Sequence, residues 1–144
     1  MPVLKEKPDN ASHCFVCGPQ NSIGLQLTFR LDDNVCRAEF TPAAHHCGYD
    51  GITHGGIIFS ALDDVMANWI VLQGQHAFTA KVDLRYKDAL PTGTPVRLEG
   101  HCLKSRGRLF LMRGVMIRID NEEVVAECEA SFMLSTASKP TAQP

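Results

Sequence analysis

The chain has 144 residues, of which 44% are hydrophobic and 21% charged, and its formal net charge is -2. This length predicts one domain with a single core, and the ordinary apolar content excludes disorder throughout. The lysines and arginines are scattered, so the concentrated basic surface typical of a nucleic-acid-binding protein is not expected. The polar ends, residues 1–13 and 135–144, predict flexible termini around a single domain over residues 14–134.

Two features bear on the location of the protein. The longest apolar stretch, residues 57–72, is interrupted by Asp63, Asp64 and Asn68, which makes it short and polar for a membrane span. Residues 1–12 lack the apolar core of a secretory signal peptide. We therefore expect a cytoplasmic protein with no membrane partner, in which the six cysteines are reduced thiols.

Alternating side chains predict two strands in the first third of the domain. Apolar residues occupy every second position over residues 25–31 and again over residues 36–40. The polar sequence Asp32-Asp33-Asn34 between them predicts a turn. The two strands should therefore pair antiparallel.

The segment that follows His54-Gly55-Gly56 is apolar nearly all the way round a helix, which predicts a helix buried in the core. Four strand-like segments come after it, at residues 77–86, 96–103, 109–119 and 124–134. The third of these is apolar on both faces and is expected in the middle of the sheet. Two strands, a buried helix and four longer strands give an α+β order, which predicts an antiparallel sheet curled around the helix.

The start of this helix offers hydrogen-bond donors. With His54 near the N-cap, the amides of Gly55, Gly56 and Ile57 have no acceptor within the helix. Glycines let another molecule approach the backbone, and the positive end of the helix dipole favours developing negative charge. One interpretation is an oxyanion hole. The other is a tight turn that packs the helix against a strand.

The two adjacent acids differ in their expected surroundings, because residues three and four apart share a helix face. Asp64 shares its face with Ser60 and Asn68, a polar stripe in which a carboxylate is solvated or hydrogen-bonded. Asp63 has mostly apolar neighbours at these spacings, so it is the candidate general base or nucleophile. For both acids the alternative is a structural carboxylate that accepts hydrogen bonds from a nearby loop.

The segment His54–Asp63 resembles the signature of hotdog-fold acyl-CoA thioesterases, in which His-Gly-Gly opens the central helix and an acid follows nine residues after the histidine. The resemblance extends through residues 79–86, a turn at residues 91–93 and the final strand. It implies a hotdog fold, a curved antiparallel sheet wrapped around one long helix. The order of the elements predicts the same architecture.

The resemblance implies hydrolysis of an acyl-CoA thioester to a free acid and CoA, and we expect no cofactor. Asp63 would activate water or attack directly, and the amides of Gly55 and Gly56 would polarise the thioester carbonyl. Active sites would lie between the subunits of a homodimer, alone or within a homotetramer. Relatives often place Ser or Thr near the acid of the partner subunit, at the position of Thr79. Strand alternation instead puts Thr79 on the polar face.

Besides Thr79, three further residues are assigned to substrate binding. Arg106 and Arg108 are candidates for the phosphates of CoA, because arginine forms bidentate phosphate contacts. A solvated surface is the alternative for both. His54 is expected to position the substrate or the helix start rather than to donate a proton.

One position departs from the family pattern. Several thioesterase subgroups have Asn or Gln six residues before the histidine, where it orients water or the carbonyl, and this chain has Gly48. Tyr49 and Asp50 are candidate substitutes, with a purely structural loop as the other interpretation. The departure supports an alternative function, a non-catalytic acyl-CoA or fatty-acid binding protein. The sequence does not predict the acyl group.

The cysteines at positions 14 and 17 have the Cys-x-x-Cys spacing that is known from metal sites. No second pair with this spacing follows. The segment from Cys14 to Leu25 also resembles a hotdog subgroup with which we associate no metal. We therefore expect structural thiols and no metal, with redox chemistry and metal binding, including a zinc-bearing interaction module, as the alternatives.

Overall fold

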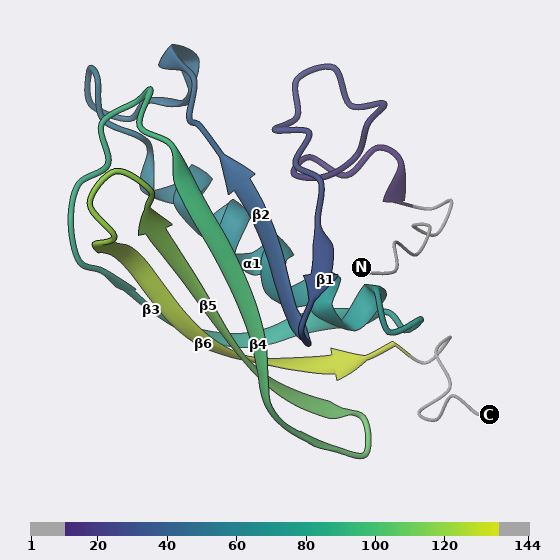
Figure 1. Cartoon of the computed structure of the whole chain (residues 1–144). Helices are drawn as coiled ribbons and strands as arrows, with labels where there is room; N and C mark the ends of the chain where they lie inside the picture. The colour runs from purple at the N-terminus through teal and green to yellow at the C-terminus, as the bar shows by residue number, and fades with distance from the viewer. Residues whose placement is uncertain (1–10, 136–144) are drawn as a thin grey trace.

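Residues 11–135 are described by the structure, a computed structural model, and form one long helix and a sheet of six strands. The elements are β1 (Arg30–Asp32), β2 (Val35–Phe40), a 3-10 turn (Ala44–His46), α1 (Gly55–Val71), β3 (Ala77–Tyr86), β4 (Val96–Arg106), β5 (Leu109–Arg118) and β6 (Val124–Leu134). The sheet bends around α1 (Figure 1), which confirms the predicted hotdog fold. The predicted flexible ends, residues 1–13 and 135–144, lie almost entirely outside the described residues.

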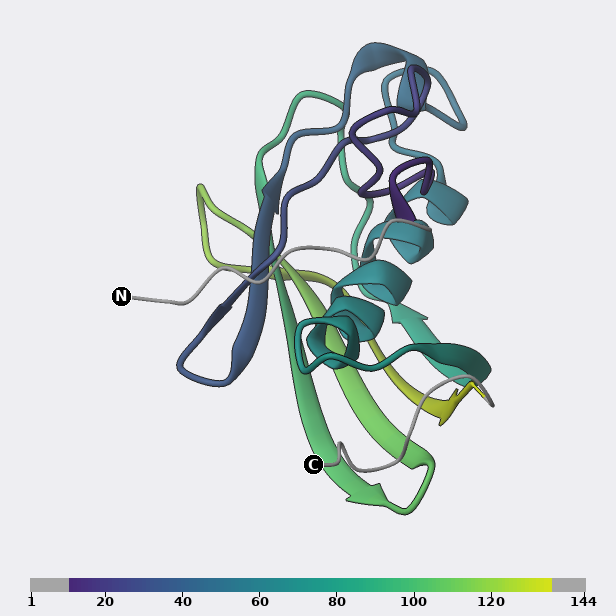
Figure 2. The ribbon, with the colours of Figure 1, turned by 90° about the vertical axis from the view of Figure 1, so that its right-hand side faces the viewer.

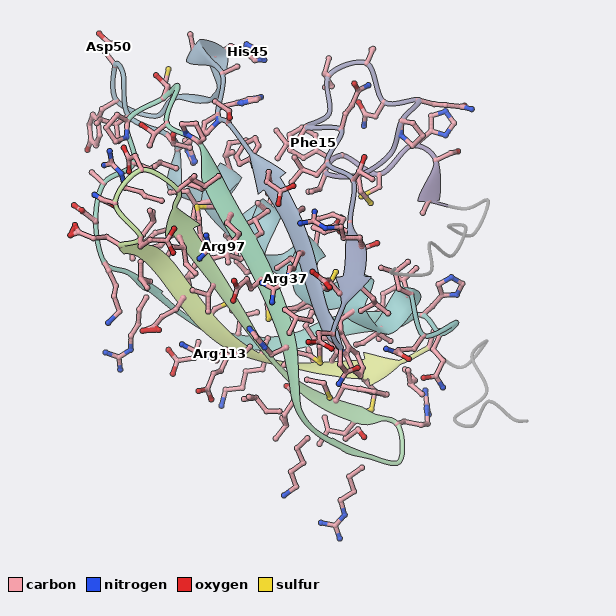
Figure 3. The ribbon with its side chains drawn as sticks, in the orientation of Figure 1. Phe15, Arg37, His45, Asp50, Arg97 and Arg113 are labelled. Carbon is pink, nitrogen blue, oxygen red and sulfur yellow. The ribbon has the colours of Figure 1, made fainter. Side chains whose placement is uncertain are left out.

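The strands follow the order β1-β2-β4-β5-β6-β3, and every neighbouring pair is antiparallel. β5 lies inside the sheet, as expected for the segment 109–119. α1 lies within the curve of the sheet (Figure 2) and packs against five strands, β2 to β6. The opposite face of the sheet carries charged side chains, among them Arg37, Arg97 and Arg113 (Figure 3), and Glu99 pairs with the first two.

α1 is buried through most of its length, as its apolar sequence predicts. The buried side chains are Ile58, Ala61, Leu62, Val65, Met66, Asn68, Trp69 and Ile70. Within residues 11–135 no helix combines the length and the apolarity needed to cross a bilayer.

Most of the first predicted strand, residues 25–31, lies outside the sheet, since only Arg30–Asp32 pairs with β2. Upstream of that pair, the amides of Leu25 and Leu27 donate to carbonyl oxygens of the N-terminal loop, at 2.8 Å each. Gln26 has a φ of 54°, which interrupts the extended backbone. The alternation does reflect burial, because Leu27 is buried, but the backbone bonds to a loop rather than to a strand.

Two glycines in neighbouring strands let α1 lie close to the sheet. Gly100 in β4 and Gly114 in β5 are cross-strand partners, and both are buried. A Cβ atom at Gly100 would come within 2.4 Å of the carbonyl oxygen of Val65, and one at Gly114 would meet the side chains of Met66 and Cys128 at 3.2 Å. The helix therefore occupies the space that side chains at these two positions would fill.

β3 is an edge strand that pairs only with β6 among the described elements, and it contains a bulge. The register shifts between Thr79 and Lys81. Side chains of a regular strand alternate between the two faces, and one extra residue reverses the alternation. Thr79 therefore faces α1 together with Val82 and Leu84, which pack against the core. The assignment of Thr79 to the polar face is wrong for this reason.

Replacing Gly100 with Ala should destabilise the fold by roughly 1–3 kcal/mol or more, because the new methyl group collides with the backbone of α1. Gly114→Ala should cost less, since its nearest neighbours include side-chain atoms that can move. Urea unfolding followed by circular dichroism measures both free energies of unfolding. Equal losses, or no loss at Gly100, would contradict the close contact described above.

Candidate functional site

The N-terminus of α1 is capped by His54, which has an extended backbone with φ -63° and ψ 134°. Its ring Nδ1 accepts a hydrogen bond from the amide of Gly56 at 2.8 Å. Its carbonyl oxygen accepts from the amides of Ile57 and Ile58. A neutral ring that accepts at Nδ1 carries its proton on Nε2. Within residues 11–135 the Gly55 amide has no acceptor, so it is the donor that remains at the helix start.

Gly55 is held against the edge strand by Tyr86. The hydroxyl of Tyr86 donates to the Gly55 carbonyl oxygen at 2.8 Å, and a Cβ atom on Gly55 would lie 3.2 Å from the same hydroxyl oxygen. A Cβ atom on Gly56 would lie 3.0 Å from the His54 ring. Both glycines therefore make close contacts, as in the packing interpretation. Among the described residues the Gly55 amide nevertheless has no acceptor, as an oxyanion hole requires.

Two cavities flank the helix start. One of about 370 Å³ is lined by His45, His46, Cys47, His54, Gly56, Ile57 and Ser60. The other, of about 410 Å³, is lined by Thr53, Gly55, Ile58, Tyr86, Lys87, Asp88, Ala89 and Leu90. Burial and the neighbouring His45 lower the pKa of His46, which favours a neutral ring there.

Thr53 contributes an unusual group to the second cavity. Its hydroxyl is buried, and among the described residues it has no hydrogen-bond partner. A buried hydroxyl without a partner is costly, and such a group at the wall of a cavity is suited to bind a polar ligand atom.

Asp63 lies two turns further along α1 and points toward β3. The Thr79 hydroxyl donates to its Oδ1 at 2.6 Å, which places both candidate residues together within one chain. Burial raises the pKa of Asp63, and the hydrogen bond from Thr79 lowers it in part. A carboxylate with a raised pKa is a stronger base than an ordinary aspartate, as general base catalysis requires.

The Asp63 carboxylate and the Gly55 amide of one chain cannot act on the same carbonyl group. Eight residues of helix separate them by about 12 Å along the axis. Helix amides also point toward the N-terminal end, so an acceptor of the Gly55 amide lies still further from Asp63. A base must reach its proton directly or through one water. Within one chain these two groups therefore do not form a complete site.

The other candidates lie apart from these two groups. Arg106 and Arg108 occupy the β4–β5 hairpin, at the opposite end of the molecule from the helix start (Figures 1 and 2). The Arg108 guanidinium donates to the Leu134 carbonyl oxygen at 2.6 Å. Tyr49 is 87% exposed, and Asp50 lies at the tip of its loop (Figure 3). The assignment of Arg106 and Arg108 to substrate binding stays a prediction, as does the substitution of Tyr49 or Asp50 for an orienting amide.

Comparison with known families identifies the chain. A family model described as the thioesterase superfamily matches residues 50–125, just over half of the sequence. The chain belongs to the thioesterase superfamily. The matched residues include the helix start, Asp63 and Thr79, and therefore cover the groups that the resemblance singled out.

Curated relatives of this thioesterase-superfamily chain are longer than it is. Human acyl-coenzyme A thioesterase THEM5 is 23% identical over 94 residues, which is 65% of this chain and 38% of the relative. Mouse acyl-coenzyme A thioesterase THEM4 is 27% identical over 101 residues, 70% of this chain and 44% of the relative. The chain thus spans less than half the length of these two relatives.

Solved structures show the same fold. The crystal structure of a thioesterase superfamily protein is 26% identical, with a TM-score of 0.79 over 91% of this chain and 68% of that one. A hypothetical thioesterase from Streptococcus pneumoniae, solved with coenzyme A, is 14% identical, with a TM-score of 0.71 over 76% of this chain and 88% of that one. At 14% identity, the likeness to the Streptococcus pneumoniae structure concerns the fold alone.

Three contributors to the site were not predicted from the sequence. Nothing in the sequence marks Thr53, which only becomes notable through its burial. The Tyr86 contact with Gly55 joins residues 31 positions apart and needs the fold. The bulge that turns Thr79 toward Asp63 has no glycine to signal it, since the extra residue is Ala80.

Replacing Thr79 with Val should shift the acidic limb of the kcat/KM profile to higher pH. The variant loses the hydroxyl that lowers the pKa of Asp63, so the pKa rises further and the base becomes protonated at a higher pH. Thr79→Ser keeps the hydroxyl and should keep the wild-type limb. The profiles are measured with an acyl-CoA substrate. A limb that stays in place in Thr79→Val would show that the Thr79 hydrogen bond does not influence the pKa that controls activity.

Proposed function

We propose that this chain hydrolyses an acyl-CoA thioester, with Asp63 as general base or nucleophile and the helix start as the carbonyl site. The observation that carries the proposal is a half-buried carboxylate with a raised pKa, hydrogen-bonded to Thr79 in a thioesterase-superfamily fold. The curated relatives are named acyl-coenzyme A thioesterases, and a structural neighbour was solved with coenzyme A. Both support CoA as the leaving group.

The proposed reaction needs only water and the thioester. Asp63 takes a proton from water while the water oxygen bonds to the carbonyl carbon, and the Gly55 amide donates to the oxygen that becomes negative. The carbon–sulfur bond then breaks, and the proton passes from Asp63 to the CoA sulfur. The products are a carboxylic acid and CoA. In the alternative with Asp63 as nucleophile, an anhydride forms first and water cleaves it.

Further support comes from the spacing of two residues. Structures of the Streptococcus pneumoniae neighbour include one variant with an aspartate replaced by alanine and another with a threonine replaced, and these two positions are 16 residues apart. Asp63 and Thr79 are also 16 residues apart and are hydrogen-bonded.

We propose a homodimer in which each site takes Asp63 from one chain and the helix start from the other. β3 is a long edge strand with two exposed aromatic side chains, Phe78 (72%) and Tyr86 (52%), and an unpaired edge of this kind favours pairing with another strand. Antiparallel pairing of two β3 edges about a twofold axis near the middle of the strand brings Thr79 of one chain near Tyr86 of the other. Each Asp63 then lies near the Gly55 of its partner.

Gly56 has a smaller part in this proposal than the sequence suggests. Its amide is bonded to the His54 ring, so it reaches a carbonyl oxygen only if that ring moves away. The Nε2–H of His54 and the Thr53 hydroxyl are additional donors beside the Gly55 amide. Arg106 and Arg108 remain candidates for the CoA phosphates, and a cytoplasmic location remains a prediction of the sequence.

A second candidate is a hotdog protein that binds acyl-CoA or fatty acids without catalysis. The observation in its favour is Gly48, where no amide side chain is present to orient water. A screen of short, medium, long and aromatic acyl-CoAs for thiol release separates the two functions. Saturable binding without thiol release across the panel would favour the binding protein.

Replacing Asp63 with Asn should lower kcat by about 10²–10⁴-fold, since the base is lost while the shape of the side chain is kept. The melting temperature should equal or exceed that of the wild type at neutral pH. Because burial raises the folded-state pKa of Asp63, the ionised carboxylate destabilises the folded wild type at neutral pH. The advantage of Asp63→Asn in melting temperature should therefore shrink as the pH falls through that pKa.

Glu129→Gln is the matched control for Asp63→Asn, because it removes an exposed carboxylate from β6 and should leave kcat near the wild-type value. Near-normal turnover in a folded Asp63→Asn variant would contradict the assignment of Asp63 as general base or nucleophile.

Gly55→Pro should lower kcat/KM by about 10²–10³-fold, because it deletes the single amide proposed to bind the carbonyl oxygen. Proline is well tolerated at the first helical position, and the extended ψ of His54 suits a following proline. Gly55→Ala is the matched control, since it adds the Cβ atom near Tyr86 but keeps the amide, and it should lose much less activity. Equal losses would exclude the amide as the cause.

Mixing the Gly55→Pro and Asp63→Asn variants tests whether the site is shared. After dissociation and reassociation, half of the dimers are mixed and each has one intact site, so about a quarter of the wild-type activity should return. A site contained in one chain would give no recovery.

A further inference from the structure

Three potential metal ligands meet on the face of α1 away from β3. The Sγ atoms of Cys14 and Cys17 and a carboxylate oxygen of Asp64 all lie within 4.8 Å of one another. Cys14 Sγ lies 3.8 Å from Asp64 Oδ1 and 3.9 Å from Oδ2. In a tetrahedral zinc site with bonds of about 2.3 Å to sulfur and 2.0–2.2 Å to oxygen, neighbouring ligand atoms are about 3.5–3.8 Å apart. The three groups are therefore already near the separations of a metal site.

The backbone around the two cysteines is shaped to hold both thiols on one side. The amide of Cys17 donates to Cys14 Sγ at 3.5 Å, and the amide of Gly18 donates to the Cys14 carbonyl oxygen at 2.8 Å. A Cβ atom on Gly18 would lie 2.3 Å from the Cys14 nitrogen and 2.6 Å from the Ser12 carbonyl oxygen. Only glycine fits this turn.

A buried amide side chain supports the other two ligands. Asn68 is 3% exposed and lies one helical turn after Asp64. Its Nδ2 donates to Asp64 Oδ2 at 3.0 Å and to Cys17 Sγ at 3.9 Å. Hydrogen bonds of this kind orient ligands in metal sites. The polar stripe of Asp64 and Asn68 expected from helical spacing thus includes an amide that donates both to Asp64 and to the Cys17 sulfur.

The charge and chemistry of the cluster favour one class of ion. Metal binding would deprotonate both thiols, and a divalent cation would offset most of the three negative charges that two thiolates and a carboxylate then carry. Thiolates select zinc rather than the oxygen-binding ions magnesium and calcium. None of the six cysteines, which all lie among the described residues, forms a disulfide that would compete for Cys14 and Cys17.

We propose that Cys14, Cys17 and Asp64 bind one Zn²⁺ ion, with water as the fourth ligand, and that the ion fastens the N-terminal segment to α1. Cys14 and Asp64 are 50 residues apart in the sequence, so the ion joins two segments that the sheet does not connect. This site is separate from Asp63, whose carboxylate points to β3. The proposed zinc site goes beyond the proposed thioesterase activity and does not depend on it.

The first test measures metal content in the 144-residue chain, purified from cells grown without added metal. We expect about one zinc per chain in the wild type, and no bound zinc in Cys14→Ser or Cys17→Ser. Asp64→Asn should bind zinc at least about tenfold more weakly. Cys102→Ser is the matched control, a half-buried cysteine in β4 outside the cluster, and it should keep its zinc.

The second test uses the wild type alone, so it does not depend on whether a variant folds. Removal of zinc with a chelator should expose two more thiols to a thiol reagent and lower the melting temperature. Addition of Co²⁺ to the zinc-free protein should then give a sulfur-to-cobalt charge-transfer band in the near ultraviolet.

A wild type that holds no zinc and gives no such band would overturn the proposal, as would zinc that persists in a Cys14→Ser, Cys17→Ser double variant. A Cys14–Cys17 disulfide in freshly purified, zinc-free protein would also overturn it. Thioester hydrolysis is not read in any of these measurements, so failure of the metal site leaves the proposed activity untouched.

Discussion

The close approach of α1 to Gly100 and Gly114 is the constraint on which the rest of the structure depends. It sets the depth of the helix in the curve of the sheet. At that depth two consecutive acids diverge by about 100° around the helix and meet different partners. Asp63 reaches the hydroxyl of Thr79 on the edge strand, and Asp64 reaches the thiol of Cys14 in the N-terminal segment. Two adjacent residues of one regular helix thus take part in two chemically distinct clusters.

The environment of Asp63 shows why the acid is half-buried rather than fully exposed or fully buried. Full exposure would leave an ordinary aspartate, which is a weak base at neutral pH. Complete burial without a partner would leave the acid protonated and unable to accept a proton. The Thr79 hydroxyl offsets part of the desolvation and keeps the charged form accessible. The pair therefore combines basicity with ionisation, which neither residue provides by itself.

The sequence predicted the parts of this protein that depend on local periodicity. The helix and the four strands after it follow from apolar spacing, and the desolvation of Asp63 follows from its neighbours at helical intervals. Features that depend on contacts between residues far apart in the sequence could not be predicted. The bulge at Ala80 reverses the side-chain alternation, the backbone of residues 25–29 bonds to a loop, and Cys14 meets an acid 50 residues away. The partner of the Gly56 amide also needed the ring orientation of His54.

The two hydroxyl contacts of β3 have a consequence for assembly. Thr79 and Tyr86, near opposite ends of the strand, are both tied to α1, one through Asp63 and one through the Gly55 carbonyl. A slip of the strand by one residue would break both contacts together and would turn its side chains to the wrong face. An exposed edge that cannot slide offers a single alignment to an incoming chain. The contacts with α1 thereby protect the exposed edge of β3 against misregistered pairing and against the disordered aggregates that such pairing starts.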